Sequence, residues 1–150
     1  MMAPNTVEGE TDVNENDHYG QTALHLAVKE GHAKVVEILA ANVNLDLQDV
    51  MGITALHSGV KNGHEIPIRI LVDAGADIEK QDQDGHTPLH YAAIGGRERV
   101  VQIFLDANAN IHKQDGRKRT PMDLATFYHH DTVIALLWEA QANLYQQRMY

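Results

Sequence analysis

A four-residue phrase returns along the chain at a nearly constant interval, and it limits the folds that are available. Its four copies are Thr22-Ala23-Leu24-His25, Thr54-Ala55-Leu56-His57, Thr87-Pro88-Leu89-His90 and Thr120-Pro121-Met122-Asp123. The threonines are separated by 32, 33 and 33 residues, and an Asp precedes each of them by five residues. Fixed periods of this length indicate stacked units that bury their apolar faces against one another. The repeat therefore predicts an elongated array and favours surface recognition over catalysis.

Each copy of the phrase begins with a residue suited to start a helix. The threonine hydroxyl can accept a hydrogen bond from the free amides of the first turn. Pro88 and Pro121 follow at the first helical position, where no amide hydrogen is needed. Gly31, Gly63 and Gly95 end these short helices, and a second apolar helix follows. The repeated Asp then begins a polar turn in which its carboxylate can accept nearby amides. One unit is therefore predicted as helix, turn, helix and finger.

This pattern resembles the ankyrin repeat, which reads D-x-x-G-x-T-P-L-H, then G-H and a second apolar helix. Four copies in phase cover residues 17–138, and partial matches stand at both ends, at 12–14 and 139–144. The resemblance implies an all-α ankyrin-repeat solenoid with short β-hairpin fingers. We expect a domain over 17–144, with repeats near 17–48, 49–81, 82–114 and 115–144. Residues 1–16 are expected to be an acidic and mostly flexible segment, and residues 145–150 a C-terminal tail.

Two turns in the fourth unit depart from the pattern. Lys118 stands where the other fingers have Gly, and His129 stands where the first three units have Gly between their helices. Residues other than Gly seldom adopt positive φ, so strained or remodelled turns are expected at both positions. Pro67 falls in the first turn of a predicted second helix, where proline is tolerated.

The composition removes several classes of function. The chain of 150 residues has no Cys, which excludes disulfides, thiolate nucleophiles and cysteine-ligated metals. The formal net charge of −9 argues against nucleic acid as a partner. No apolar run approaches the roughly 18 residues of a membrane span, and the acidic N-terminus is no signal peptide. We therefore expect a cytoplasmic protein with no membrane partner.

Ten histidines invite a metal or catalytic interpretation, but the repeat accounts for most of them. The resemblance assigns a structural position, linking neighbouring repeats, to His25, His57 and His90. His86 precedes the helix cap and therefore does not share a helical face with His90. An enzyme would have to use the adjacent His129, His130 and Asp131. Since the chain has no nucleophile, phosphate-binding or dinucleotide motif, we expect no enzyme, no catalytic residue, no metal and no cofactor.

Proteins that resemble this chain bind partners on the concave surface made by finger tips and first helices. Here the C-terminal half of that surface is aromatic and apolar, beside a basic triplet. The candidate partner-binding residues are Tyr19, Met51, Ile53, Tyr91, Ile94, Arg117, Lys118, Arg119, Phe127 and Tyr128. We expect a non-catalytic adaptor or scaffold that docks another protein through an acidic or apolar segment. Ile94, Phe127 and Tyr128 would be apolar anchors, and Arg117 and Arg119 would pair with acids.

The C-terminal end carries apolar side chains where an array normally needs a polar cap. Trp138 is predicted to face the place where a next repeat would stack, and residues 139–144 echo the start of a finger. Either the array continues beyond this chain or the tail folds back over Trp138. As a third interpretation, Trp138, Tyr145 and Tyr150 mediate self-association, and the alternative function is a structural or self-assembly module. We expect a monomer with at most weak self-association.

Overall fold

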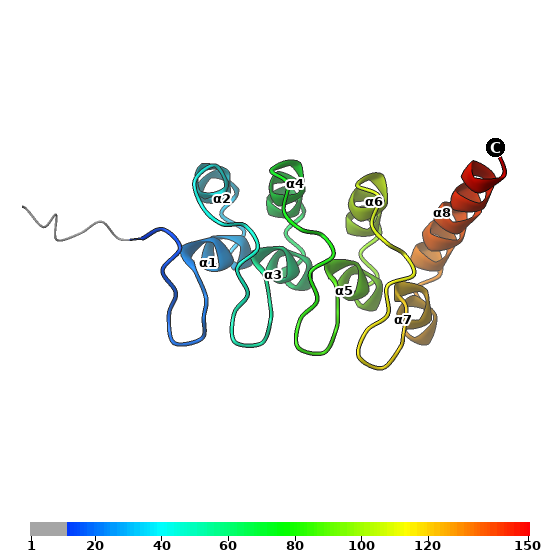
Figure 1. Cartoon of the computed structure of the whole chain (residues 1–150), viewed down its shortest axis with the longest axis horizontal. Coiled ribbons are helices and arrows are strands. Elements are labelled where there is room, and N and C mark those ends of the chain that lie inside the picture. Colours follow the sequence, from blue (N-terminus) through cyan, green and yellow to red (C-terminus); the bar gives the residue numbers. More distant parts are fainter. Residues whose placement is uncertain (1–11) are drawn as a thin grey trace, which may run out of the picture.

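A computed structural model describes residues 12–150, and the eight helices of this part of the chain form two rows (Figure 1). The first row contains α1 (Ala23–Lys29), α3 (Ala55–Asn62), α5 (Pro88–Ile94) and α7 (Pro121–Phe127). The second row contains α2 (Ala33–Ala40), α4 (Glu65–Asp73), α6 (Glu98–Asp106) and α8 (Asp131–Met149). The loop that begins each unit projects beyond the first row as a finger (Figure 1). The predicted all-α solenoid is confirmed.

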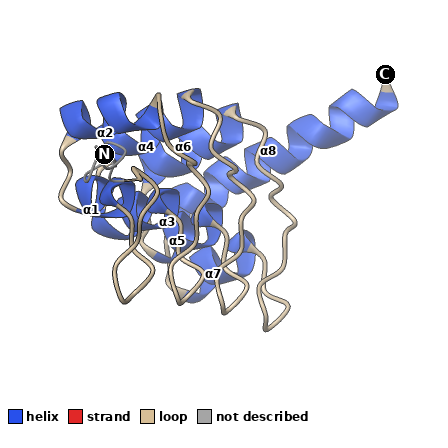
Figure 2. Ribbon diagram, turned by 60° about the vertical axis from the view of Figure 1, so that its left-hand side comes forward, coloured by secondary structure: helices blue, strands red, loops and turns tan. Residues whose placement is uncertain are grey.

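The fingers have the path of a hairpin but little strand structure. Residues 12–150 contain no assigned strand, and one isolated bridge joins Asn16 to Thr22 (Figure 2). Asn14 lies in the expected partial repeat at the N-terminal end, and its side-chain Oδ1 accepts the Asn44 amide at 2.8 Å. The same bond recurs one and two units later, in the pairs Asp46–Asp77 and Glu79–Asn110. Most of the expected flexible segment, residues 1–11, lies outside the described residues.

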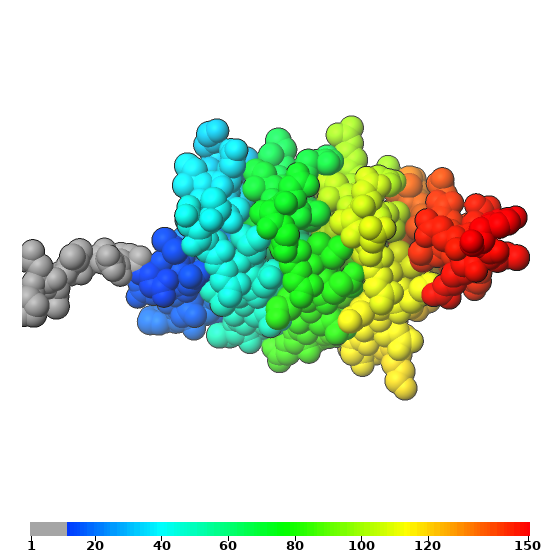
Figure 3. Space-filling model, turned by 45° about the horizontal axis from the view of Figure 1, so that its top comes forward, coloured from blue at the N-terminus to red at the C-terminus, as the bar shows by residue number. Residues whose placement is uncertain are grey.

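Each unit packs against the next through matching helices. The first-row helices contact one another in sequence, and α2, α4, α6 and α8 do the same. Leu24, Leu56 and Leu89 of the repeated phrase are buried, as are Leu71 and Phe104 of the second helices. The space-filling view shows the units as successive layers (Figure 3). The array therefore has one continuous core, in which most of the stabilising contact crosses from one repeat to its neighbour.

A buried histidine connects each of the first three helix caps to the next finger. In repeat 2, the Thr54 hydroxyl lies 2.8 Å from His57 Nδ1, and the Thr54 amide donates to the same nitrogen at 3.1 Å. His57 Nε2 lies 2.9 Å from the carbonyl oxygen of His86. A carbonyl can only accept, so Nε2 carries the proton and Nδ1 is the acceptor. The equivalent bonds run from His25 to Ile53 and from His90 to Arg119.

The fourth unit keeps the cap but loses this connection. Asp123 takes the histidine position, where its Oδ2 accepts the Thr120 amide at 2.9 Å. A carboxylate has no proton to donate to a following finger. The row of histidine bonds between units therefore stops at repeat 4.

Strained or remodelled turns are the two expected outcomes in the fourth unit, and the structure shows strained ones. Lys118 has φ +61° and His129 has φ +59°, both in the left-handed region. Pro67 is buried in the first turn of α4 and leaves the helix intact.

The prediction for the C-terminal segment is wrong. Residues 139–144 continue α8 instead of starting a finger, so the proposed boundary at 144/145 falls inside a helix. The second helices α4 and α6 end at left-handed residues, Gly75 and Asn108, with φ +90° and +60°. The residue 33 positions after Asn108 is Gln141, a good helix former, and the helix propagates through it. The tail does not fold back over Trp138 and instead projects from the stack (Figure 2).

Removing one capping hydroxyl should show how much each cap contributes. In Thr54→Ala, the amide of His57 loses its acceptor and His57 Nδ1 loses one of its two donors. We expect the free energy of unfolding to fall by about 1–2 kcal/mol in urea denaturation. In the control Thr126→Ala, an exposed hydroxyl bonded to the Met122 carbonyl is removed, and the change should stay under about 0.5 kcal/mol. Equal losses in both variants would contradict the cap's role.

The buried histidines should also make stability depend on pH. Burial lowers the pKa of His57 and of His90 from the ordinary 6.5, although the backbone hydrogen bonds oppose this shift. Below pH 6.5 the unfolded chain binds protons that the folded chain does not, so these residues reduce stability as the pH falls. We expect the Tm, measured by circular dichroism, to fall less between about pH 7.5 and 5.5 in His57→Gln than in the wild type.

The control for this experiment is His32→Gln, because His32 is exposed. This variant should keep the pH dependence of the wild type. A His57→Gln chain with an unchanged pH dependence would contradict the assignment of His57 as a buried neutral imidazole.

Candidate partner-binding surface

The repeated Asp folds each finger tip. Asp82 Oδ1 accepts the amides of Asp84 and His86 at 3.0 and 2.9 Å. The same pair of bonds is present at Asp17, Asp49 and Asp115. The predicted role of these carboxylates in the turn is confirmed, and it leaves the tips with little freedom.

Neighbouring fingers are also bonded to one another. Backbone amides of Val50, Gln83 and Gly116 donate to carbonyls of the preceding finger, with N···O distances of 2.8–2.9 Å. Gly85 has φ +81°, and a Cβ placed on it would lie 2.5 Å from the Gly116 nitrogen. The fingers can approach this closely only because glycine occupies that position. The four tips therefore form one connected surface.

Two adjoining hollows lie along the concave side of this surface. The first is lined by Lys29, Met51, Lys61 and Tyr91, among others. The second is lined by residues of the third and fourth fingers and by Tyr128. Asp82 and Asp84 border both hollows, and the two hollows together are called the groove below.

The structure exposes most of the predicted binding residues. Phe127 is 70% exposed, and its ring meets that of Tyr128 edge to face with centroids 5.0 Å apart. Tyr128 and the cations Arg117 and Lys118 are exposed, as are Tyr19 and Met51 on the first two fingers. Tyr91 and Ile94 are half-buried. Ile53, another of the candidate partner-binding residues, is only 9% exposed and so offers little surface to a partner. It precedes the cap residue Thr54, where the chain turns into the core.

Arg119 does not have the free charge that the sequence suggested. Its Nε and Nη2 both lie 2.9 Å from Oδ2 of the buried Asp115. Burial alone would raise the pKa of Asp115, but the amide and guanidinium of Arg119 and the amide of Arg117 lower it to about 2. The two charges compensate each other inside the chain. Arg117 and Lys118 are therefore the cations of the triplet that remain available at this finger.

Tyr91 joins α5 to the third finger. Its hydroxyl donates to Asp82 Oδ2, and the Lys61 ammonium lies 5.2 Å from the ring centroid. Burial, together with the hydrogen bond to Asp82, raises the pKa of Tyr91 well above its ordinary value. Tyr91 is therefore a neutral donor that fixes the floor of the groove.

His86 is a residue whose placement the sequence did not reveal. Its half-buried side chain lies between the third and fourth fingers, with Nε2 3.2 Å from Asp115 Oδ2 and Nδ1 3.8 Å from Asp82 Oδ1. The sequence signal that could have drawn attention to His86 was its alternation with Asp82 and Asp84. One potential metal-ligand atom from each of these three side chains lies within 4.8 Å of the others. Both oxygens of Asp82 already accept hydrogen bonds from the chain. The Asp82 carboxylate is therefore already used by the third finger and by Tyr91 of α5.

Two further histidines, His64 and His130, link neighbouring units through the backbone. His130 Nε2 donates to the Ile94 carbonyl at 2.8 Å and so links α8 to the preceding unit. His64 makes the equivalent bond to the Lys29 carbonyl at 3.0 Å. His129 is exposed in its left-handed turn. The grouping of His129, His130 and Asp131 is thus explained by the architecture.

Comparisons with known proteins agree with this architecture. None of the helices described within residues 12–150 has the length and apolar character needed to cross a membrane. The family model for ankyrin repeats in three copies matches residues 4–82 and 68–148. A search of curated proteins finds no match. Ankyrin repeats are generally protein–protein interaction modules and are typically not enzymes. The repeated phrase, the stacked helix pairs and this match together show that the chain belongs to the ankyrin-repeat family.

Proposed function

We propose that this protein is a non-catalytic adaptor or scaffold that docks a segment of a partner protein across repeats 3 and 4. The proposal rests on the exposed Phe127–Tyr128 ring pair lying on the same repeat as the uncompensated cations Arg117 and Lys118. Aromatic residues and Arg are enriched at the energetically dominant positions of interfaces. A rigid surface also loses little conformational entropy when it binds.

The chemistry of the surface favours a partner segment with acidic and apolar side chains. Arg117 and Lys118 project from the fourth finger of a chain whose net charge is −9, so they form a local basic site on an acidic protein. Acidic groups of the partner would pair with these cations, which chiefly affects orientation and association rate. Phe127 and Tyr128 would cover the apolar side chains. Arg119 contributes by holding Asp115 in place, and Tyr91 contributes to the floor of the groove. Ile94 of the same helix would add an apolar contact.

Tyr19 and Met51 would extend the contact toward the N-terminal fingers, since both are exposed and Met51 lines the first hollow. The net charge continues to argue against nucleic acid as the partner. A cytoplasmic location remains a prediction from the composition of the chain.

Selection from a random peptide library tests this proposal, because the protein itself then selects the ligand chemistry that its surface prefers. We expect enriched peptides to combine acidic residues with aromatic or aliphatic ones. Their affinity, measured by calorimetry, should fall at least about tenfold for the double variant Arg117→Glu, Tyr128→Ala. The control is Lys34→Glu, Ile38→Ala, which changes an exposed cation and an exposed apolar residue on α2. Circular dichroism verifies that both variants fold.

Equal loss of affinity in both variants, or none in either, would place the contact elsewhere and contradict the proposal. Enrichment of basic peptides would also contradict it, because the cations of repeat 4 would then repel the ligand.

A further inference from the structure

The helix α8 is apolar on two separate faces. One face packs into the stack through Val133 and Leu137, which are buried. The other face is a row that we name the α8 stripe: Ala135, Trp138, Ala142, Tyr145 and Met149. All five residues are exposed, with Trp138 at 60%, Tyr145 at 61% and Met149 at 80%. At 100° per residue, the centre of this stripe lies about 140° around the helix from the centre of the buried pair.

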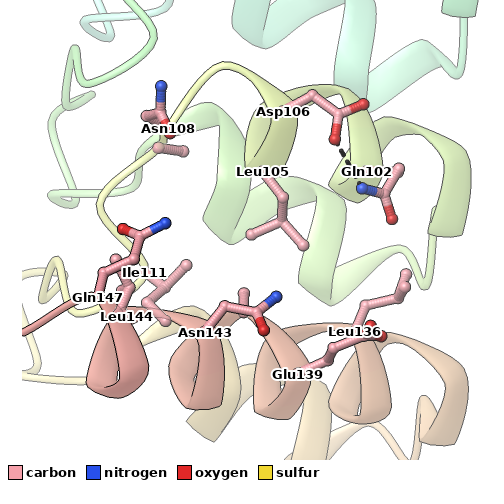
Figure 4. A pocket seen from close by; sticks show the side chains of 12 residues that line it. Gln102, Leu105, Asp106, Asn108, Ile111, Leu136, Glu139, Asn143, Leu144 and Gln147 are labelled. Carbon is pink, nitrogen blue, oxygen red and sulfur yellow. Dashed lines mark hydrogen bonds between the residues drawn. The ribbon is translucent and has the colours of Figure 1, made fainter. Parts of the chain in front are cut away.

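No described segment of the chain covers the stripe. The groove between α6 and α8 lies on another side of the helix, where Leu105 and Ile111 approach Leu136 and Leu144 (Figure 4). Repeat arrays usually have a polar outer face on the terminal repeat. The stripe instead has spacings of 3, 4, 3 and 4 residues, which is the a/d pattern of a helix that pairs with another helix.

We propose that the α8 stripe is a homodimer interface, in which α8 of a second copy packs antiparallel across it. The stripe can pair with itself about a two-fold axis. With the two-fold axis between residues 143 and 144, Tyr145 lies opposite Ala142 of the second copy. Trp138 then lies opposite Met149, and thioether–aromatic contacts are favourable. A two-fold axis makes each of these contacts twice.

The helix dipole of α8 favours the same arrangement. Glu139 and Arg148 are the charged residues between positions 134 and 150. The antiparallel pairing brings Glu139 to the level of Arg148 of the second copy, although the two side chains lie on opposite flanks of the stripe. A parallel pairing would align the two helix dipoles unfavourably. The helix dipoles thus favour a second antiparallel copy over a parallel one.

The area available predicts a weak and reversible dimer. Trp138, Tyr145 and Met149 can each bury on the order of 100 Å² beyond what is already covered. With the flanking residues of both copies, the interface would bury roughly 800–1,000 Å², near the lower limit for a specific complex. We therefore expect a dissociation constant on the order of tens of micromolar.

Sedimentation equilibrium and tryptophan fluorescence of the full chain test the proposal. Trp138 is the single tryptophan, so its emission reports directly on the stripe. From roughly 5 to 500 µM, the mean mass should rise from monomer toward dimer and the emission should shift to shorter wavelength. Tyr145→Glu should abolish both changes. Gln147→Glu adds the same charge outside the stripe, beside the α6–α8 groove, and should leave both unchanged.

Cross-linking tests the orientation, because the chain has no native cysteine. In the antiparallel pair the two residues at position 149 are about 16 Å apart along the helices, whereas those at position 142 are about 4.5 Å apart. A short bismaleimide should therefore link Ala142→Cys and fail to link Met149→Cys. A monomer at every concentration, or a Tyr145→Glu variant that dimerises like the wild type, would overturn the proposal. Efficient linking at position 149 would overturn the antiparallel arrangement.

Discussion

In each of the first three repeats, one buried imidazole joins the helix cap of its own unit to the backbone of the next finger. Its two nitrogens have fixed and different roles: Nδ1 accepts within the repeat and Nε2 donates to the neighbour. This bond sets how far one unit is displaced from the next, so the packing of the leucines and the alignment of the fingers both depend on it. A protonated ring would have no acceptor for the Thr amide, and burial lowers the pKa of His57 and of His90, which favours their neutral form.

The fingers are ordered by a second layer of polar contacts built on the same period. Each Asp carboxylate closes its own tip, and the tips are bonded to one another through the backbone. Between repeats 3 and 4, His86 adds a side-chain contact to Asp115 of the next finger, and Arg119 pairs with Asp115 within that finger. Charges used in this way are unavailable to a partner. The surface that remains for recognition is therefore defined by the side chains that the architecture does not use, chiefly Arg117, Lys118, Phe127 and Tyr128.

The two proposed interfaces occupy different parts of the molecule. The groove lies along the fingers and first helices, whereas the α8 stripe lies on the last helix, which projects from the stack (Figure 2). A dimer through α8 would leave both grooves open and would present two of them in one particle. Two linked sites raise the apparent affinity for a partner that carries two binding segments, without any additional contact.

The sequence by itself determined the features that depend on a few neighbouring residues: the period, the threonine caps, the Asp turns and the left-handed conformations of Lys118 and His129. These follow from backbone hydrogen bonding and steric limits within about five positions. The continuation of α8 beyond residue 141 could also have been predicted, since Gln141 stands at the position that Gly75 and Asn108 occupy in earlier repeats. The resemblance of residues 139–144 to the start of a finger concealed it. Only the tertiary structure decided that Ile53 is buried, that His86 lies between two fingers, and that the α8 stripe is exposed. Burial and side-chain pairing across repeats depend on residues about 30 positions apart, whose relative placement the stacking geometry sets.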